Sequence, residues 1–471
     1  MNPKERHTQR ILQVILMILA VIYLPGCGGG TNSTPSAVIP SSPAASSATQ
    51  IRIGDGPADS VVSFEITLNS IILTPSFGPA ITVLNTPTRL EVTHHAGTFE
   101  PLTVVNIPQG TYTSASVNVS NPGVTIIDPT TKKTKTLNVL LSSATVVINF
   151  NPPLAINGAA TSLNFDLNVL NSLTITGSSG AVTPTFTVTM STVGQESGQH
   201  VDSGEIEDFT GAVTAVNGTS FTVSSHNGNM TLTFNTDANT KFEGITGVTQ
   251  LTIGTIVKVE GVTKPDGSLY AKEVETKIEH ETSGDVKEAL EIEGLVTKVT
   301  GNPATSFDVL PREISAAVGT TPTLGTGVTV NVGTNTKFFF DSKHLDLSGL
   351  PFTPTFDATT LIAGQNIEVD TEMPSTTTID ARRVVLKSQT VTGAVSNFTS
   401  AGSSASFTLT VPADSAFATL TGKTTVTVFQ KSMSELMGIT AIANGDTVRV
   451  RGLLFVDGTT LKLVARRIGK P

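Results

Sequence analysis

The chain has 471 residues, with 38 acidic against 29 basic side chains and a formal net charge of −9. This balance disfavours non-specific nucleic-acid binding, which needs a basic surface, so we expect no nucleic-acid partner. Hydrophobic residues make up 38% of the chain, which argues against intrinsic disorder. At about 150 residues per domain the length predicts about three domains, and the internal repeats described below raise that number to four.

The first residues have the layout of a secretory signal. Lys4, Arg6 and Arg10 give a basic start, and the apolar run ILQVILMILAVIYL follows it. This run is shorter than the roughly 20 apolar residues that a membrane-spanning helix needs. We therefore predict a signal peptide over residues 1–26.

The only cysteine of the chain follows this signal, in the sequence Leu24-Pro25-Gly26-Cys27. The tetrapeptide resembles the lipobox of bacterial lipoproteins, with proline where alanine or serine is more usual. The resemblance implies a diacylglyceryl group on Cys27, cleavage before this residue, and acylation of the new N-terminus by fatty acids such as palmitate. The alternative is an ordinary signal with an incidental cysteine. We predict a lipid anchor at Cys27, because two or three acyl chains suffice for stable anchoring and no second cysteine is present for a disulfide.

Residues 27–48 are rich in glycine, serine, proline and threonine and lack apolar periodicity, which predicts a flexible tether. Gly28 stands where aspartate tends to mark inner-membrane retention in Gram-negative lipoproteins. We therefore expect a cell-envelope protein anchored in the outer membrane, on its periplasmic face or at the cell surface.

The segment 49–196 has the pattern of a β-sandwich. In SFEITLNSIIL, the apolar residues Phe64, Ile66 and Leu68 stand at every second position, as in a half-buried strand. Similar alternation recurs in TYTSASVNVS and PTFTVTM, with turn residues between the runs.

Three pieces of this segment resemble an uncharacterised bacterial family, domain of unknown function 4382. They are IGDGPADS, IPQGTY and LNFDLNVLNS, which begin at Ile53, Ile107 and Leu163. The resemblance implies no activity. We expect Tyr112, in the second piece, to pack in the core with its hydroxyl bonded to the backbone.

The rest of the chain contains three repeats. FTGAVTAVNGTSFTV, IEGLVTKVTGNPATSFDV and VTGAVSNFTSAGSSASFTL, from Phe209, Ile292 and Val391, each open with a glycine, make a turn and return with Ser-Phe. Internal similarity at this spacing indicates tandem modules. The predicted modules occupy residues 208–277, 291–388 and 390–470.

Each repeat contains five or six short strands with one apolar face. Such strands close most economically into a small barrel, which leaves few exposed edges. Gly211, Gly294 and Gly393 fit strand starts that must bend sharply. We predict an all-β protein with an N-terminal β-sandwich followed by three tandem small OB-like β-barrels.

The repeats resemble a second uncharacterised family, domain of unknown function 5666, found on secreted and lipid-anchored bacterial proteins. The resemblance extends over residues 208–470, and the first repeat matches best. The second repeat carries insertions around residues 311–327 and 345–356. No activity follows from this resemblance.

Candidate metal ligands are few. Adjacent residues on a strand point to opposite faces, so His94 and His95 are not expected to chelate one ion. Asp55 and Asp59 could share a cation, but a turn-forming role before glycine or proline is favoured. We predict no metal site and no cofactor.

The stretch KIEHETSGDVKEALE at residues 277–291 is polar and acidic and contains His280. It lacks the oxygen spacing of a calcium loop, and we interpret it as a solvated linker between the first two repeats.

Catalytic and polyanion-binding signals are weak. No G-x-S-x-G motif or glycine-rich phosphate loop is present, so we expect no enzyme.

The last repeat ends in a basic run, Arg449, Arg451, Arg466, Arg467 and Lys470. Binding to nucleic acid would need exposed aromatic side chains beside it. We interpret the run as a solvated edge that discourages aggregation, with anionic glycan or lipid as the alternative.

These observations predict a lipid-anchored cell-envelope protein that acts as a non-catalytic binding or interaction module. Its expected partners are the membrane, through Cys27, and a carbohydrate, a peptide or another envelope protein. Tandem modules on a tether gain effective concentration from linked weak sites. An envelope hydrolase with a site assembled from distant strands, and a structural stalk, remain as alternatives.

Overall fold

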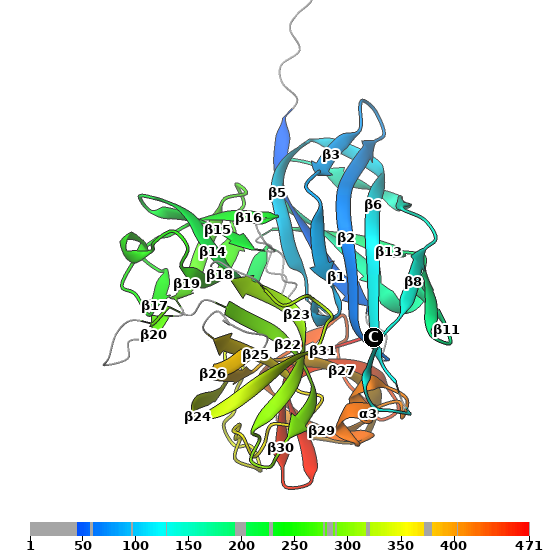
Figure 1. Ribbon diagram of the computed structural model, residues 1–471. Helices are drawn as coiled ribbons and strands as arrows, with labels where there is room; N and C mark the ends of the chain where they lie inside the picture. Colours follow the sequence, from blue (N-terminus) through cyan, green and yellow to red (C-terminus); the bar gives the residue numbers. More distant parts are fainter. Residues whose placement is uncertain are drawn as a thin grey trace, which may run out of the picture. The chain divides into compact units, whose positions relative to one another are not determined.

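The computed structural model describes residues 45–470 with gaps at 57–59, 96–97, 129, 194–203, 226–228, 277, 280–285, 288–289, 317–320, 372–378 and 403. The predicted signal peptide, the lipobox with Cys27, and the tether up to residue 44 lie outside the described residues, as do Asp59 and His280. No helix in the described part of the chain is long and apolar enough to cross a membrane. Almost all of the described elements are strands, which confirms the predicted all-β fold (Figure 1).

Two sheets form the N-terminal β-sandwich. The first has the order β13-β10-β1-β5, in which β1 runs parallel to β10. Its strands are β1 (Ser46–Gly56), β5 (Glu100–Pro108), β10 (Thr161–Asn168) and β13 (Phe186–Thr192). Strand β1 therefore begins inside the segment that the sequence analysis assigned to the tether.

The second sheet is built on the long strands β2 and β6, which pair with each other. Strands β3 and β4 pair with β2, and β7 and β9 pair with β6. The bounds are β2 (Val61–Pro75), β3 (Ile81–Leu84), β4 (Thr88–Glu91), β6 (Gly110–Ile127), β7 (Thr134–Thr136) and β9 (Thr145–Ile156). A small third sheet joins β8 (Asn138–Leu141), β11 (Leu173–Thr176) and β12 (Ser179–Val182), with α2 (Val169–Ser172) beside them in sequence.

The sandwich core follows the predicted alternation. Phe64, Ile66 and Leu68 on β2 are fully buried, which removes their apolar surface from water. Tyr112 on β6 is also buried, and its hydroxyl donates a hydrogen bond to the carbonyl oxygen of Pro108 at 2.7 Å. This contact confirms the expected role of Tyr112, because a buried hydroxyl needs a partner.

The second and third repeats are closed five-stranded barrels with the strand orders β22-β23-β24-β26-β25 and β27-β28-β29-β31-β30. The second contains β22 (Leu290–Thr300), β23 (Ser306–Ala316), β24 (Val328–Phe340), β25 (Asn366–Thr371) and β26 (Ile379–Leu386). The third contains β27 (Gln389–Ala401), β28 (Ser404–Thr410), α3 (Ala416–Thr421), β29 (Thr425–Met437), β30 (Thr447–Asp457) and β31 (Thr460–Gly469).

The first repeat has the same order with its third strand split in two. Its sheet runs β16-β15-β14-β18-β19-β17, and β16 also pairs with β19, which joins the ends of the five-strand path. The strands are β14 (Glu205–Asn217), β15 (Ser220–Ser225), β16 (Met230–Asn235), β17 (Lys241–Glu243), β18 (Ile256–Thr263) and β19 (Leu269–Thr276), with the 3-10 turn η3 (Val248–Gln250). The short strands β20 (Ile278–Glu279) and β21 (Val286–Lys287) pair after it. Three Greek-key barrels of the OB type therefore follow the sandwich.

The repeated glycine has a steric cause in every barrel. A Cβ placed on Gly211, Gly294 or Gly393 would overlap a carbonyl oxygen of the neighbouring strand. Only glycine allows the first two strands of each barrel to approach so closely.

Candidate functional site

Side chains from the sandwich and from all three barrels meet around a small polar cavity of about 60 Å³. Six carboxylates, five cationic side chains and two histidines line it. The cavity belongs to the compact unit formed by residues 45–471. Because charges in the interior need partners, the pairing within this junction decides what it can bind.

The two histidines lie on a turn, not on a strand. The 3-10 turn η1 (Thr93–His95) follows β4, and the ring centroids of His94 and His95 lie only 3.6 Å apart. The expectation that these side chains point to opposite faces was therefore wrong. The carboxylate of Glu91 ends the strand, because it accepts hydrogen bonds from the backbone N–H groups of Thr93 at 3.1 Å and His94 at 3.3 Å.

Glu91 also holds the ring of His94. Its Oε2 lies 3.0 Å from Nδ1 of His94, while Oε1 accepts from the Thr93 hydroxyl at 2.7 Å and from the backbone N–H of Phe64 at 2.8 Å. Burial alone would raise the pKa of Glu91, but the hydrogen bond and the charge of His94, with help from Arg312, lower it to about 2. Glu91 is therefore an ionised acceptor, and Nδ1 of His94 is the donor.

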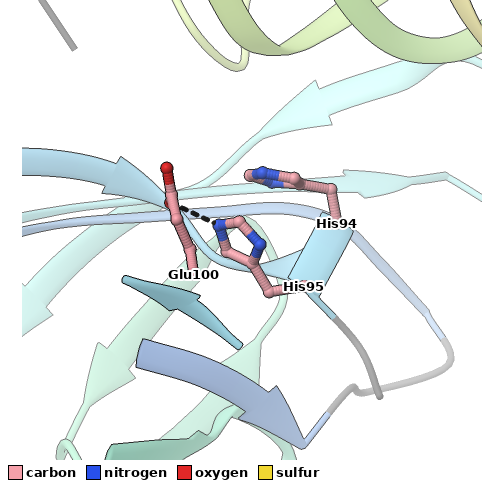
Figure 2. A group of neighbouring side chains, drawn as sticks. All are labelled: His94, His95 and Glu100. Atoms are coloured by element: carbon pink, nitrogen blue, oxygen red, sulfur yellow. Dashed lines mark ion pairs between the residues drawn. The ribbon is translucent and has the colours of Figure 1, made fainter. Parts of the chain in front are cut away.

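His95 pairs with Glu100 at the start of β5. Nε2 of His95 lies 2.8 Å from Oε2 of Glu100, and both side chains are at most 10% exposed. Burial and the neighbouring His94 lower the pKa of His95, against the opposing effect of Glu100. Figure 2 shows the two imidazoles and this carboxylate grouped together, with the His95–Glu100 pair marked.

The second barrel contributes a further carboxylate. Oε2 of Glu313, on β23, lies 3.9 Å from Nε2 of His94. Burial and the nearby acids Glu100 and Glu293 raise the pKa of Glu313 well above its ordinary value. From β30 of the third barrel, Nη1 of Arg451 donates to the carbonyl oxygen of His94 at 3.2 Å and fixes the backbone of the turn.

A network of buried charges joins the first barrel to the second. Nζ of Lys387 lies 3.3 Å from Asp208, 3.1 Å from Asp341 and 3.5 Å from Glu368. Lys258 contacts the same three carboxylates at 3.3–4.0 Å. Burial opposes ionisation, but the lysines hold the pKa of Asp208 well below its ordinary value, and the carboxylates raise the pKa of Lys387.

A β-bulge delivers the acids of the first barrel to this network. The register of β14 against β18 shifts between Ile206 and Phe209, and Asp208 has a φ of +51°. A bulge re-aims side chains that regular pleating would send to alternate faces. Glu207 and Asp208 therefore both reach the cavity.

The interpretation of the basic run as a solvated edge was wrong for its arginines, although Lys470 is exposed. Arg466 and Arg467 both contact Oε1 of Glu207, at 2.8 and 2.7 Å, and Arg467 also contacts Glu435 at 2.8 Å. Arg467 is only 4% exposed. These arginines bind the first barrel and cannot present a polyanion-binding surface.

Asp55 has no turn-forming role either. It lies within β1, opposite Leu167, and is 3% exposed. Burial, with the charges of Glu91 and Asp166, raises its pKa well above the ordinary value. Its predicted partner Asp59 falls outside the described residues.

A second acidic group, Glu291, Glu368 and Asp370, lies on strands β22 and β25 of the second barrel, at positions that alternate with the apolar core residues of these strands. Glu368 contacts Lys258 and Lys387, and Arg383 lies 3.6 Å from Asp370. These cations neutralise the group, so it does not stand out as a metal centre.

A larger groove of about 490 Å³ lies on the first barrel. Tyr270 lines it, with Nζ of Lys264 5.3 Å from the ring centroid. Lys343, from the loop after β24, reaches it and pairs with Glu273 and Glu260. No feature of the sequence marked this groove, because strands β18 and β19 and a loop of another module build it together.

A family model described as a domain of unknown function (DUF5666) matches residues 210–275. This match confirms the family resemblance for the first barrel. None of the curated proteins matches the chain. Among solved structures, the chain is similar to the wild-type single-stranded DNA binding protein from Thermus aquaticus at 11% identity, covering 39% of this chain and 92% of that chain, with a TM-score of 0.15. A deletion mutant of that protein matches at 13% identity, covering 39% and 94%, with the same TM-score.

Proposed function

We propose that this chain is a lipid-anchored protein of the bacterial cell envelope whose β modules bind an oligosaccharide without catalysing a reaction. The sequence Leu24-Pro25-Gly26-Cys27 supports the anchor, with attachment to the outer membrane through Cys27. The groove on the first barrel is the observation that carries the binding role.

The groove suits a polar, largely uncharged ligand. Its volume of about 490 Å³ falls within the range of small-molecule sites, roughly 300–1,000 Å³. Carboxylates and lysine ammonium groups line the groove, so it offers both hydrogen-bond acceptors and donors. Tyr270 adds an aromatic face. OB-type barrels bind oligosaccharides and oligonucleotides, and the net charge of −9 disfavours the oligonucleotide.

The two alternatives have less support. His94, His95 and His344, the histidines in the described part of the chain, form their side-chain ion pairs with glutamates. In the described part of the chain no serine or threonine hydroxyl is hydrogen-bonded to a nitrogen of these imidazoles, as a hydrolase of the serine type would require. The buried ion pairs between barrels argue against a stalk of independent modules.

The anchor is tested by fatty-acid labelling and membrane fractionation of the native protein beside a Cys27→Ser variant. We expect label and membrane association only in the native protein. Protease added to intact cells then distinguishes surface display from a periplasmic orientation. An unlabelled native protein, or a membrane-bound serine variant, would overturn the anchor.

Binding is tested on a glycan array, followed by calorimetry of the strongest hit with Tyr270→Ala. We expect the substitution to lower the affinity about fivefold, because stacking against an aromatic ring contributes on the order of 1 kcal/mol. Phe77→Ala is the matched control, since Phe77 is 96% exposed and lies outside the groove. No glycan binding, or equal loss in both variants, would refute the proposal.

A further inference from the structure

The histidine turn beside the polar cavity has no part in the proposed glycan binding. One ring nitrogen from each of His94 and His95 and a carboxylate oxygen of Glu100 all lie within 4.8 Å of one another. Donors that share a zinc-type ion at 2.0–2.2 Å stand about 3–4 Å apart, so small side-chain rotations would bring the three onto one ion. Two imidazoles with a carboxylate form a ligand set typical of divalent transition metals.

The orientation of His94 is that of a metal ligand. Its Nδ1 donates to the carboxylate of Glu91, which leaves Nε2 as the atom available for coordination. Nε2 is buried and has no hydrogen-bond partner among the described residues, and the side chain is 7% exposed. Ligating histidines usually donate their other ring N–H to a carboxylate, as His94 does here.

The supporting shell is itself fixed. Glu91 accepts four further hydrogen bonds, from Phe64, from Thr93 and from the backbone N–H of His94, so its carboxylate cannot rotate away from the His94 ring. Arg451 donates to the carbonyl oxygen of His94 and holds the turn from the third barrel. A site built only for a salt bridge would not need a buried imidazole nitrogen without a partner.

We propose that His94, His95 and Glu100 bind one divalent transition-metal ion of the zinc type, with Glu313 as the fourth ligand. Glu313 comes from β23 of the second barrel and lies 3.9 Å from Nε2 of His94. The ion would thus link the sandwich to the second barrel. The expectation of no metal site depended on the two histidines facing opposite ways, which the turn η1 prevents.

The test uses the full chain without a polyhistidine tag, stripped with a chelator and titrated with Zn²⁺ by calorimetry. We expect one ion per chain and a rise in melting temperature with Zn²⁺ concentration, because a ligand that binds only the folded state stabilises it. X-ray absorption of the zinc-loaded wild type should show nitrogen and oxygen neighbours at about 2.0–2.2 Å and no sulfur. This readout needs no variant and therefore survives a folding defect.

Variants identify the ligands. Glu91→Gln should weaken Zn²⁺ binding roughly 10–100-fold, as expected for loss of a supporting partner, and His95→Gln should weaken it more. His344→Gln is the matched control, because His344 is 52% exposed, pairs with Glu260 and lies outside the site. A wild type that binds no Zn²⁺ at micromolar concentration would overturn the proposal. Unchanged binding in His95→Gln would also overturn it.

Discussion

Nη2 of Arg467 lies 2.7 Å from Oε1 of Glu207, although 260 positions separate these two residues in the chain. The contact joins the last strand of the third barrel to the first strand of the first barrel. Arg466 contacts the same oxygen at 2.8 Å. Burial alone would raise the pKa of Glu207, but the two guanidinium groups hold it below its ordinary value.

Loss of this pair should destabilise the protein strongly. Arg467→Met removes the guanidinium group that pairs with the carboxylates of Glu207 and Glu435. Breaking a buried ion pair lowers the unfolding free energy by about 3–5 kcal/mol. Urea denaturation monitored by circular dichroism measures the change in unfolding free energy.

Lys272→Met is the comparison for this prediction. Lys272 pairs with Glu205, also on β14, but the two side chains are 50% and 43% exposed. A surface pair contributes about 0–1 kcal/mol, so this variant should be nearly neutral. Equal losses in the two variants would show that burial of the Arg467–Glu207 pair has no special role.

The charge network around Asp208 should appear in the acid dependence of stability. Burial alone would raise the pKa of Asp208, but the cations Lys258, Lys387 and Arg466 hold it well below 3.8. Asp341 and Glu368 share the two lysines with Asp208. The unfolded chain therefore binds more protons than the folded chain in this range. The contribution of Asp208 is complete above pH of about 4 and is lost as the pH falls through the folded-state pKa.

Asp208→Asn tests this dependence. The variant should be less stable at pH 7, and its unfolding free energy should fall less steeply than that of the wild type below pH of about 4. Denaturant titrations at several pH values give both slopes. If the unfolding free energies of the wild type and the variant fell in parallel with decreasing pH, the lowered pKa of Asp208 would be contradicted.

The barrel glycines should not tolerate a methyl group. Gly294→Ala would push a Cβ into the carbonyl oxygen of Leu310, and overpacking of this kind costs about 1–3 kcal/mol, at times more. Gly110→Ala is the control, because a Cβ there meets nothing within 4 Å. The measurement is the melting temperature of each variant, which should fall for Gly294→Ala and stay near that of the wild type for Gly110→Ala. An unchanged melting temperature of Gly294→Ala would refute the steric explanation.

The repeated pattern in the sequence was enough to predict the barrels. Val223 and Phe221 are buried at every second position, and the strands of each repeat could be placed because period-two alternation is local. The glycine at the start of each repeat was also visible, although its partner, a carbonyl oxygen on the next strand, was not. Split pairing in the first barrel, where β16 and β17 share β19, left no mark in the pattern.

The charged junction could not be predicted in the same way. A strand model sends His94 and His95 to opposite faces, but the Glu91 carboxylate ends the strand and turns them together. The bulge at Glu207 and Asp208 likewise breaks the alternation on which the prediction depends.

By itself the sequence determined the all-β class, the order of the four modules and the lipobox prediction at Cys27, because each depends on residues close together in the chain. Only the tertiary structure decided which partners the charged side chains have. From the sequence we interpreted the arginines of the last repeat as a solvated edge. In the structure Arg467 pairs with Glu207, which lies 260 positions away in the chain. Ion pairs and metal ligands form between residues that only folding brings together, since Coulomb energy depends on distance in space and not on separation in the chain.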